Sequence, residues 1–140
     1  MDKGAIKIKA GACAILDNSV GLCRPFIPLS VKRDEAEITI DLNQIASPFY
    51  QKLTGYKTAG SLQTVDFPVF GFNKDKELLN RGVSFIDMET FYFADFFKGN
   101  NFFPLLAGTD AGDAKAFSDF KKNLPRASEE LKNAIMQIIS

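Results

Sequence analysis

The stretch Phe85–Lys98, which reads FIDMETFYFADFFK, carries the most informative pattern in the chain. At 100° per residue, most of its apolar side chains fall on one broad arc and most of its polar side chains on the other. A strand would instead place two carboxylates on the same face as several phenylalanines. The pattern therefore predicts an amphipathic helix over 85–98, ended by Gly99 in the left-handed conformation.

Glu89 and Phe91 depart from this helical pattern. Glu89 falls near the centre of the apolar arc, where an ionised carboxylate is costly unless a cation pairs with it. Two interpretations stay open: an acid at the edge of the packed face or paired with an arginine, or a buried acid in a ligand pocket or a switch. Phe91 falls on the polar arc, so we expect it to face away from the core.

Aromatic residues crowd the segment that follows, and one helix face and one strand can hardly bury them all. We expect Phe91, Phe102 and Phe103 to contact a partner or a ligand. The last helix has regular apolar spacing, and it places Ile138 and Ile139 next to the chain end. These two residues either close the protein's own core or pack on a partner.

Outside this region, strand patterns dominate the first half of the chain. Ala5–Lys9 and Glu37–Leu42 alternate apolar and polar residues, as half-buried strands do. Helical patterns dominate the second half. We therefore expect an α+β fold in a single domain over 1–140, with mainly antiparallel strands in the N-terminal half and helices in the C-terminal half.

The composition excludes several kinds of function. The 140 residues include 17 Lys+Arg, 17 Asp+Glu and no histidine. Without histidine, Ser-His-Asp and Cys-His catalysis and histidine metal sites are impossible. The charges alternate in blocks without a basic stripe, which argues against duplex nucleic acid. We expect no cofactor, no metal and no nucleic acid, and catalysis would have to rely on carboxylates, lysine, tyrosine or cysteine.

The two cysteines, Cys13 and Cys23, are too few for a cysteine zinc site. If residues 12–24 form a hairpin centred on Asn18, the two cysteines face each other and can form a disulfide. The alternative is two buried thiols in a reducing compartment.

Residues 110–113 place Asp110 and Asp113 on a turn. We interpret this pattern as a helix cap at Asp113 rather than a cation site. The sequence gives no sign of two acids that converge in a cleft.

No segment reaches the roughly 18 apolar residues that span a bilayer, and the first seven residues lack the apolar run of a signal peptide. We expect a soluble protein in the cytoplasm or in an assembled particle.

These patterns favour a non-catalytic structural protein, an assembly subunit that forms an oligomer or joins a larger complex. Its protein–protein interaction would use the phenylalanine-rich surface around residues 85–106. The alternative is a carrier of small apolar ligands with a pocket lined by Phe and Tyr, in which Glu89 orients the ligand. We expect no enzyme activity.

Overall fold

The computed structural model describes residues 5–45, 49–67 and 72–140, and strand β7 (Phe102–Asp110) lies second from one edge of its sheet. This strand is buried along almost its whole length. It pairs in parallel with β1 (Lys7–Ile15), from Lys7↔Phe102 to Ala14↔Asp110. A strand that is covered on both faces has a nearly continuous run of apolar residues, and β7 has such a run.

The other strands extend this pair into a seven-stranded sheet in the order β2-β7-β1-β6-β5-β3-β4. Their bounds are β2 (Pro25–Phe26), β3 (Ser30–Arg33), β4 (Ala36–Thr39), β5 (Ser61–Thr64) and β6 (Val83–Asp87). The pairs β1–β7, β3–β5 and β5–β6 are parallel, and the pairs β1–β6, β2–β7 and β3–β4 are antiparallel. The sheet is therefore mixed, and the expected mainly antiparallel sheet is wrong.

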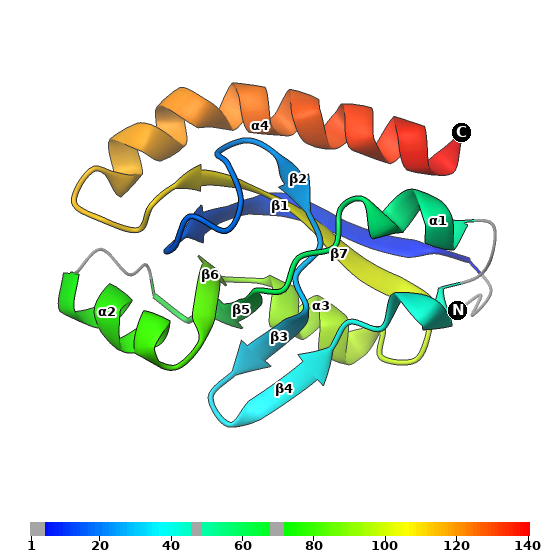
Figure 1. Ribbon diagram of the computed structural model, residues 1–140, viewed down its shortest axis with the longest axis horizontal. Coiled ribbons are helices and arrows are strands. Elements are labelled where there is room, and N and C mark those ends of the chain that lie inside the picture. The colour runs from blue at the N-terminus through cyan, green and yellow to red at the C-terminus, as the bar shows by residue number, and fades with distance from the viewer. Residues whose placement is uncertain (1–4, 46–48, 68–71) are drawn as a thin grey trace.

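Helices lie between the strands rather than after them. Their bounds are η1 (Leu42–Gln44), α1 (Phe49–Thr54), α2 (Phe72–Asn80), α3 (Thr90–Phe96) and α4 (Ala116–Ile139). Figure 1 shows α4 along one face of the sheet, over β1 and β7, with α2 and α3 on the opposite side. The expected α+β segregation of strands and helices is wrong, because parallel neighbours need long crossover connections, and α2 forms part of one of them.

The predicted helix over 85–98 is in fact the end of a strand followed by a short helix. Phe85 and Ile86 belong to β6, in which all five residues are buried, and α3 begins only at Thr90. Phe91 packs partly buried against the core, whereas Phe93 and Phe96 are 43% and 69% exposed. A short strand covered on both faces has no alternation, so its apolar residues merged with those of the helix into one apparent helical period.

The main core lies between the sheet and α4, whose inward side chains are Ala127, Leu131, Ala134 and Ile138. Helix α4 continues through Pro125 over its 24 residues. Phe103 is fully buried in this core. Ile138 also closes the protein's own core, while Ile139 is 55% exposed.

Cys13 and Cys23 are both buried and both free. The expected hairpin over 12–24 does not form, because β1 pairs with β7 and β6 and the chain after β1 pairs, as β2, with β7. The possible disulfide is therefore absent, and the two cysteines are buried thiols, as the other interpretation expected. The Cys23 thiol instead lies 3.7 Å from the main-chain carbonyl of Asn123.

Gly108 in β7 is required by its neighbour in β1. A Cβ at this position would lie 2.1 Å from Cδ1 and 2.3 Å from Cγ1 of Ile15. We expect Gly108→Ala to lower the free energy of unfolding by about 1–3 kcal/mol through overpacking, as measured by urea denaturation. Gly55→Ala is the control, because nothing lies within 4 Å of its Cβ position. Equal stability of the two variants would contradict this packing, and adding Ile15→Ala should restore part of the loss.

Candidate functional site

Two carboxylates that are distant in sequence lie beside one position of β1. Ala14 pairs with Ile86 of β6 on one side and with Asp110 of β7 on the other. Asp87 directly follows Ile86, so Asp87 and Asp110 flank the same part of β1. Burial raises the pKa of the Cys13 thiol, and the negative charges of both carboxylates raise it further. The fold thus brings Asp87 and Asp110 close to the same residue, Cys13, which the sequence did not reveal.

Asp87 is held in place by several hydrogen bonds and an ion pair. Its carboxylate accepts hydrogen bonds from the Thr64 hydroxyl (2.8 Å), the Thr90 hydroxyl and the backbone N–H groups of Glu89 (3.3 Å) and Thr90 (3.1 Å). The Lys9 ammonium lies 3.6 Å away, and the Lys9 and Asp87 side chains are only 9% and 4% exposed. Asp87 therefore fixes the start of α3 through backbone groups that the helix cannot satisfy itself.

Glu89 lies at the N-terminal end of α3 and points toward solvent. Its side chain is 67% exposed, and its carboxylate is 3.7 Å from the Lys9 ammonium. The prediction of a buried acid is wrong because the helix begins after this residue. Its cationic partner is a lysine of β1 and not an arginine. An accessible carboxylate held by a lysine can accept hydrogen bonds from the hydroxyl groups of a ligand.

Asp110 is the buried acid of the site. Burial raises its pKa above the ordinary 3.8, although hydrogen bonds from the Gly112 N–H (2.9 Å) and the Thr109 hydroxyl (3.0 Å) act in the opposite direction. A carboxyl group with a raised pKa keeps its proton to higher pH and can serve as a general acid. In the predicted turn at 110–113, Asp113 accepts the Lys115 N–H just before α4, whose N-cap residue is Lys115.

Aromatic side chains surround Asp66, which follows β5 in the sequence. The Tyr92 hydroxyl donates to Asp66 (2.9 Å), and the Arg33 guanidinium lies 3.3 Å from Asp66 and 5.1 Å from the centre of the Tyr92 ring. These two partners lower the pKa of Asp66. Phe67 and Met88 are 80% and 43% exposed. The exposed apolar surface is suited to contact with a flat ring.

The residues predicted to form an interface do not form one surface. Phe102 is half-buried and stacks on Phe97 at 5.7 Å between ring centres. Phe103 and Ile138 are core residues, because β7 and α4 face each other there, and neither is accessible to a partner. Phe91 is half-buried, and Ile139 is exposed at the far end of α4.

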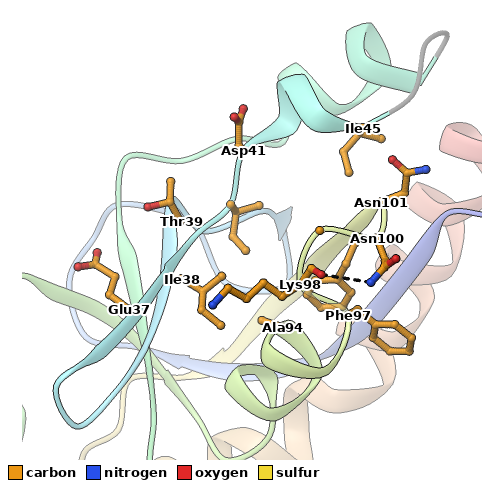
Figure 2. Close-up of a pocket in the computed structure, with 13 residues that line it drawn as sticks. Glu37, Ile38, Thr39, Asp41, Ile45, Ala94, Phe97, Lys98, Asn100 and Asn101 are labelled. Carbon is orange, nitrogen blue, oxygen red and sulfur yellow. Dashed lines mark hydrogen bonds between the residues drawn. The ribbon is translucent and has the colours of Figure 1, made fainter. Parts of the chain in front are cut away.

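A separate hollow of about 380 Å³ lies between β4 and the turn after α3, as Figure 2 shows. Its rim carries exposed polar residues, among them Glu37, Asp41 and Lys98, and the Asn100 amide donates to the Lys98 carbonyl (3.1 Å). These polar groups are in contact with solvent, so the carboxylates around β1 form the stronger candidate site.

Within residues 5–45, 49–67 and 72–140, no three histidine, cysteine, aspartate or glutamate side chains are placed to hold a metal ion. In the same ranges no helix is long and apolar enough to cross a bilayer.

Comparison with known proteins shows which solved structures share this fold. No protein-family model and no curated protein matches the amino-acid sequence. Solved structures do match. The chain aligns with 5′-methylthioadenosine/S-adenosylhomocysteine nucleosidase from Neisseria meningitidis at a TM-score of 0.75 and 16% identity, covering 96% of this chain and 68% of that one. The Streptococcus pneumoniae nucleosidase matches at a TM-score of 0.77 and 14% identity, with the same coverage.

Futalosine hydrolase of Helicobacter pylori matches at a TM-score of 0.75 and 12% identity, covering 94% of this chain and 66% of that one. The chain has the nucleosidase fold. It thus spans about two thirds of the length of these nucleosidase-fold proteins.

These matches correct our functional expectations. The solved proteins that share the nucleosidase fold are nucleosidases and a hydrolase, which are catalysts. The expected non-catalytic assembly subunit, the alternative apolar-ligand carrier and the expected lack of enzyme activity are therefore wrong. The carrier pocket also fails on geometry, because Phe85 is buried in β6 while Phe93 and Phe96 are exposed on α3.

Proposed function

We propose that the site around β1 is a nucleosidase site, which cleaves the N-glycosidic bond between a purine base and ribose by adding water. The observation that carries this proposal is that Lys9, Asp87 and Asp110 all act electrostatically on Cys13, with Asp110 buried and raised in pKa and Glu89 exposed beside Lys9. Hydrolysis of a glycosidic bond commonly uses two carboxyl groups, one that is protonated and donates a proton and one that stays ionised.

The proposed reaction uses the two acids in different roles. As the bond between C1′ and the base nitrogen breaks, its electron pair moves to the base, and Asp110 donates a proton to a ring nitrogen of that base. The ribosyl group becomes cationic and is attacked at C1′ by water, which then releases a proton to the solvent. Asp110 takes up a proton from the solvent, which restores the acid. Glu89 accepts a hydrogen bond from a ribose hydroxyl, and its negative charge stabilises the cation.

The exposed aromatic border supports a purine as the base. Phe67 directly follows Asp66, which accepts the Tyr92 hydroxyl, and its ring is 80% exposed, so a flat ring can stack on it. The nucleosidases with this fold are named for adenine nucleosides. We therefore propose adenine nucleosides with a substituted 5′ position as the substrate class.

The test is release of adenine from 5′-methylthioadenosine and from S-adenosylhomocysteine, followed by chromatography. We expect hydrolysis by the wild-type protein and a fall in kcat/KM of about tenfold or more for Glu89→Gln, since a hydrogen bond to a charged group is lost. Glu77→Gln is the control, because this exposed acid of α2 pairs with Arg81 away from the site. Absence of adenine release from both substrates would overturn the proposal.

A further inference from the structure

Lys9 of β1 carries a buried positive charge at the candidate site. Its side chain is only 9% exposed, and its ammonium lies 3.6 Å from the Asp87 carboxylate and 3.7 Å from that of Glu89. Burial of an ammonium group is costly unless anionic partners offset the hydration that it loses. The two distances are nearly equal, so the ammonium links the buried acid of β6 to the exposed acid at the start of α3.

Asp87 does not need this lysine to satisfy its hydrogen bonds. An ionised carboxylate has about four acceptor positions. Two threonine hydroxyls and the backbone N–H groups of Glu89 and Thr90 already donate to Asp87. The Glu89 carboxylate differs, because in the described part of the chain the Lys9 ammonium is its one side-chain partner. The lysine is therefore the group that holds the Glu89 side chain.

Gly11 leaves the space that the ammonium occupies. Lys9 and Gly11 are two residues apart in β1, so they face the same side of the sheet. A Cβ on Gly11 would lie 2.7 Å from Lys9 Nζ and 3.6 Å from Lys9 Cε. The lysine side chain thus lies over the glycine, and a larger residue at position 11 would displace its charged end.

We propose that Lys9 is a positioning residue for recognition of the ribose. Its ammonium holds one oxygen of the Glu89 carboxylate, Oε2, and leaves the other oxygen free to accept a hydrogen bond from a ribose hydroxyl. This rests on the proposed function, in which Glu89 accepts that bond. A carboxylate that is held in place before the ligand arrives loses less conformational entropy on binding.

The test compares two C-nucleosides with the same purine-like base, one carrying ribose and the other 2′,3′-dideoxyribose. A carbon–carbon bond joins sugar and base in both, so neither compound can be hydrolysed. Calorimetry gives the two dissociation constants, and their ratio measures recognition of the ribose hydroxyls. We expect the wild-type protein to prefer the ribose compound by about tenfold or more, because a hydrogen bond to a charged group is made. A general loss of structure would weaken both compounds alike and leave the ratio unchanged.

Two variants remove the contact between Lys9 and Glu89 in different ways. Lys9→Met removes the charge, and we expect it to lower the preference by about two- to fivefold, as the loss of a partly exposed ion pair would. It also leaves Asp87 without its cation and lowers stability. Gly11→Ala keeps the lysine but displaces its ammonium, and only the end of a flexible side chain has to move. We expect Gly11→Ala to lower the preference similarly and to leave urea denaturation nearly unchanged.

A control and a double variant show how the lysine acts. Lys132→Met removes the same charge from an exposed position on α4, which Figure 1 shows across the sheet from α3, and it should leave the preference unchanged. In a protein that already carries Glu89→Gln, adding Lys9→Met should lower the preference no further. Such non-additivity is expected when one residue acts through the other.

Several results would overturn the positioning role. They are no binding of the ribose compound at about 1 mM, equal affinity of the wild-type protein for both compounds, a preference that Gly11→Ala leaves intact, or an effect of Lys9→Met that persists beside Glu89→Gln. The binding measurements need no turnover. Adenine release together with a preference that is insensitive to Lys9 would leave the proposed function standing and remove the positioning role. A preference that depends on Lys9 without adenine release would do the reverse.

Discussion

Replacing Asp110 by asparagine is expected to lower kcat for adenine release by about 10²–10⁴-fold, because the proposed general acid is removed. The amide can still accept a hydrogen bond from the Gly112 N–H, so the turn after β7 is retained. Glu77→Gln is the control, since this exposed acid of α2 pairs with Arg81 away from the site. A kcat for Asp110→Asn equal to that of the control would contradict the assigned role.

The same variant has an expected effect on stability. The pKa of Asp110 is raised in the folded state, so its contribution to stability is fully present below the unfolded value of 3.8 and is lost as the pH rises through the folded pKa. Asparagine has no such dependence. The melting temperature of Asp110→Asn relative to wild type should therefore rise between pH 4 and pH 8, and a constant difference would show that burial of the charge has no cost.

Asp87→Ala is expected to lower the free energy of unfolding by about 3–5 kcal/mol, because it leaves the ammonium of a buried lysine without its buried partner. It also removes the acceptor for the first amides of α3 and for two threonine hydroxyls. Glu89 remains near Lys9, but its side chain is exposed and the pair is weaker.

Two further variants show which interactions of Asp87 cause the loss of stability. Asp87→Asn keeps an acceptor for the amides of α3, so urea denaturation should show a smaller loss than for alanine. Glu77→Ala removes an exposed ion pair with Arg81 and should cost about 0–1 kcal/mol. If Asp87→Ala is no less stable than Glu77→Ala, the buried pair does not hold the start of α3.

Part of the fold could be predicted from single segments. The alternation over Glu37–Leu42 predicted a strand, and β4 (Ala36–Thr39) forms there. The apolar spacing near the C-terminus predicted a helix, and Ile138 lies on its buried side. These patterns are local, because one face of each element is covered and the other is in solvent.

The remaining errors arise where both faces of an element are buried. Strand β6 has no alternation, so the run through Phe85 and Ile86 read as the beginning of a helix. Because of that error, Glu89 was expected on the apolar side of a helix, whereas it is exposed at the start of α3. Asp110 ends the buried run of β7, which is a usable local signal, but its proximity to Asp87 depends on which strands flank β1.

The β1–β7 ladder has a consequence for how the protein is made. Its two strands occupy opposite ends of the sequence, at Lys7–Ile15 and Phe102–Asp110. Joining them closes a loop that contains most of the chain, a step with a large entropic cost that slows folding. During synthesis, β1 therefore cannot form its hydrogen bonds with β7 until β7 has left the ribosome. Asp110 is thus among the last groups to join the candidate site, and a nascent chain that ends before β7 lacks the proposed general acid.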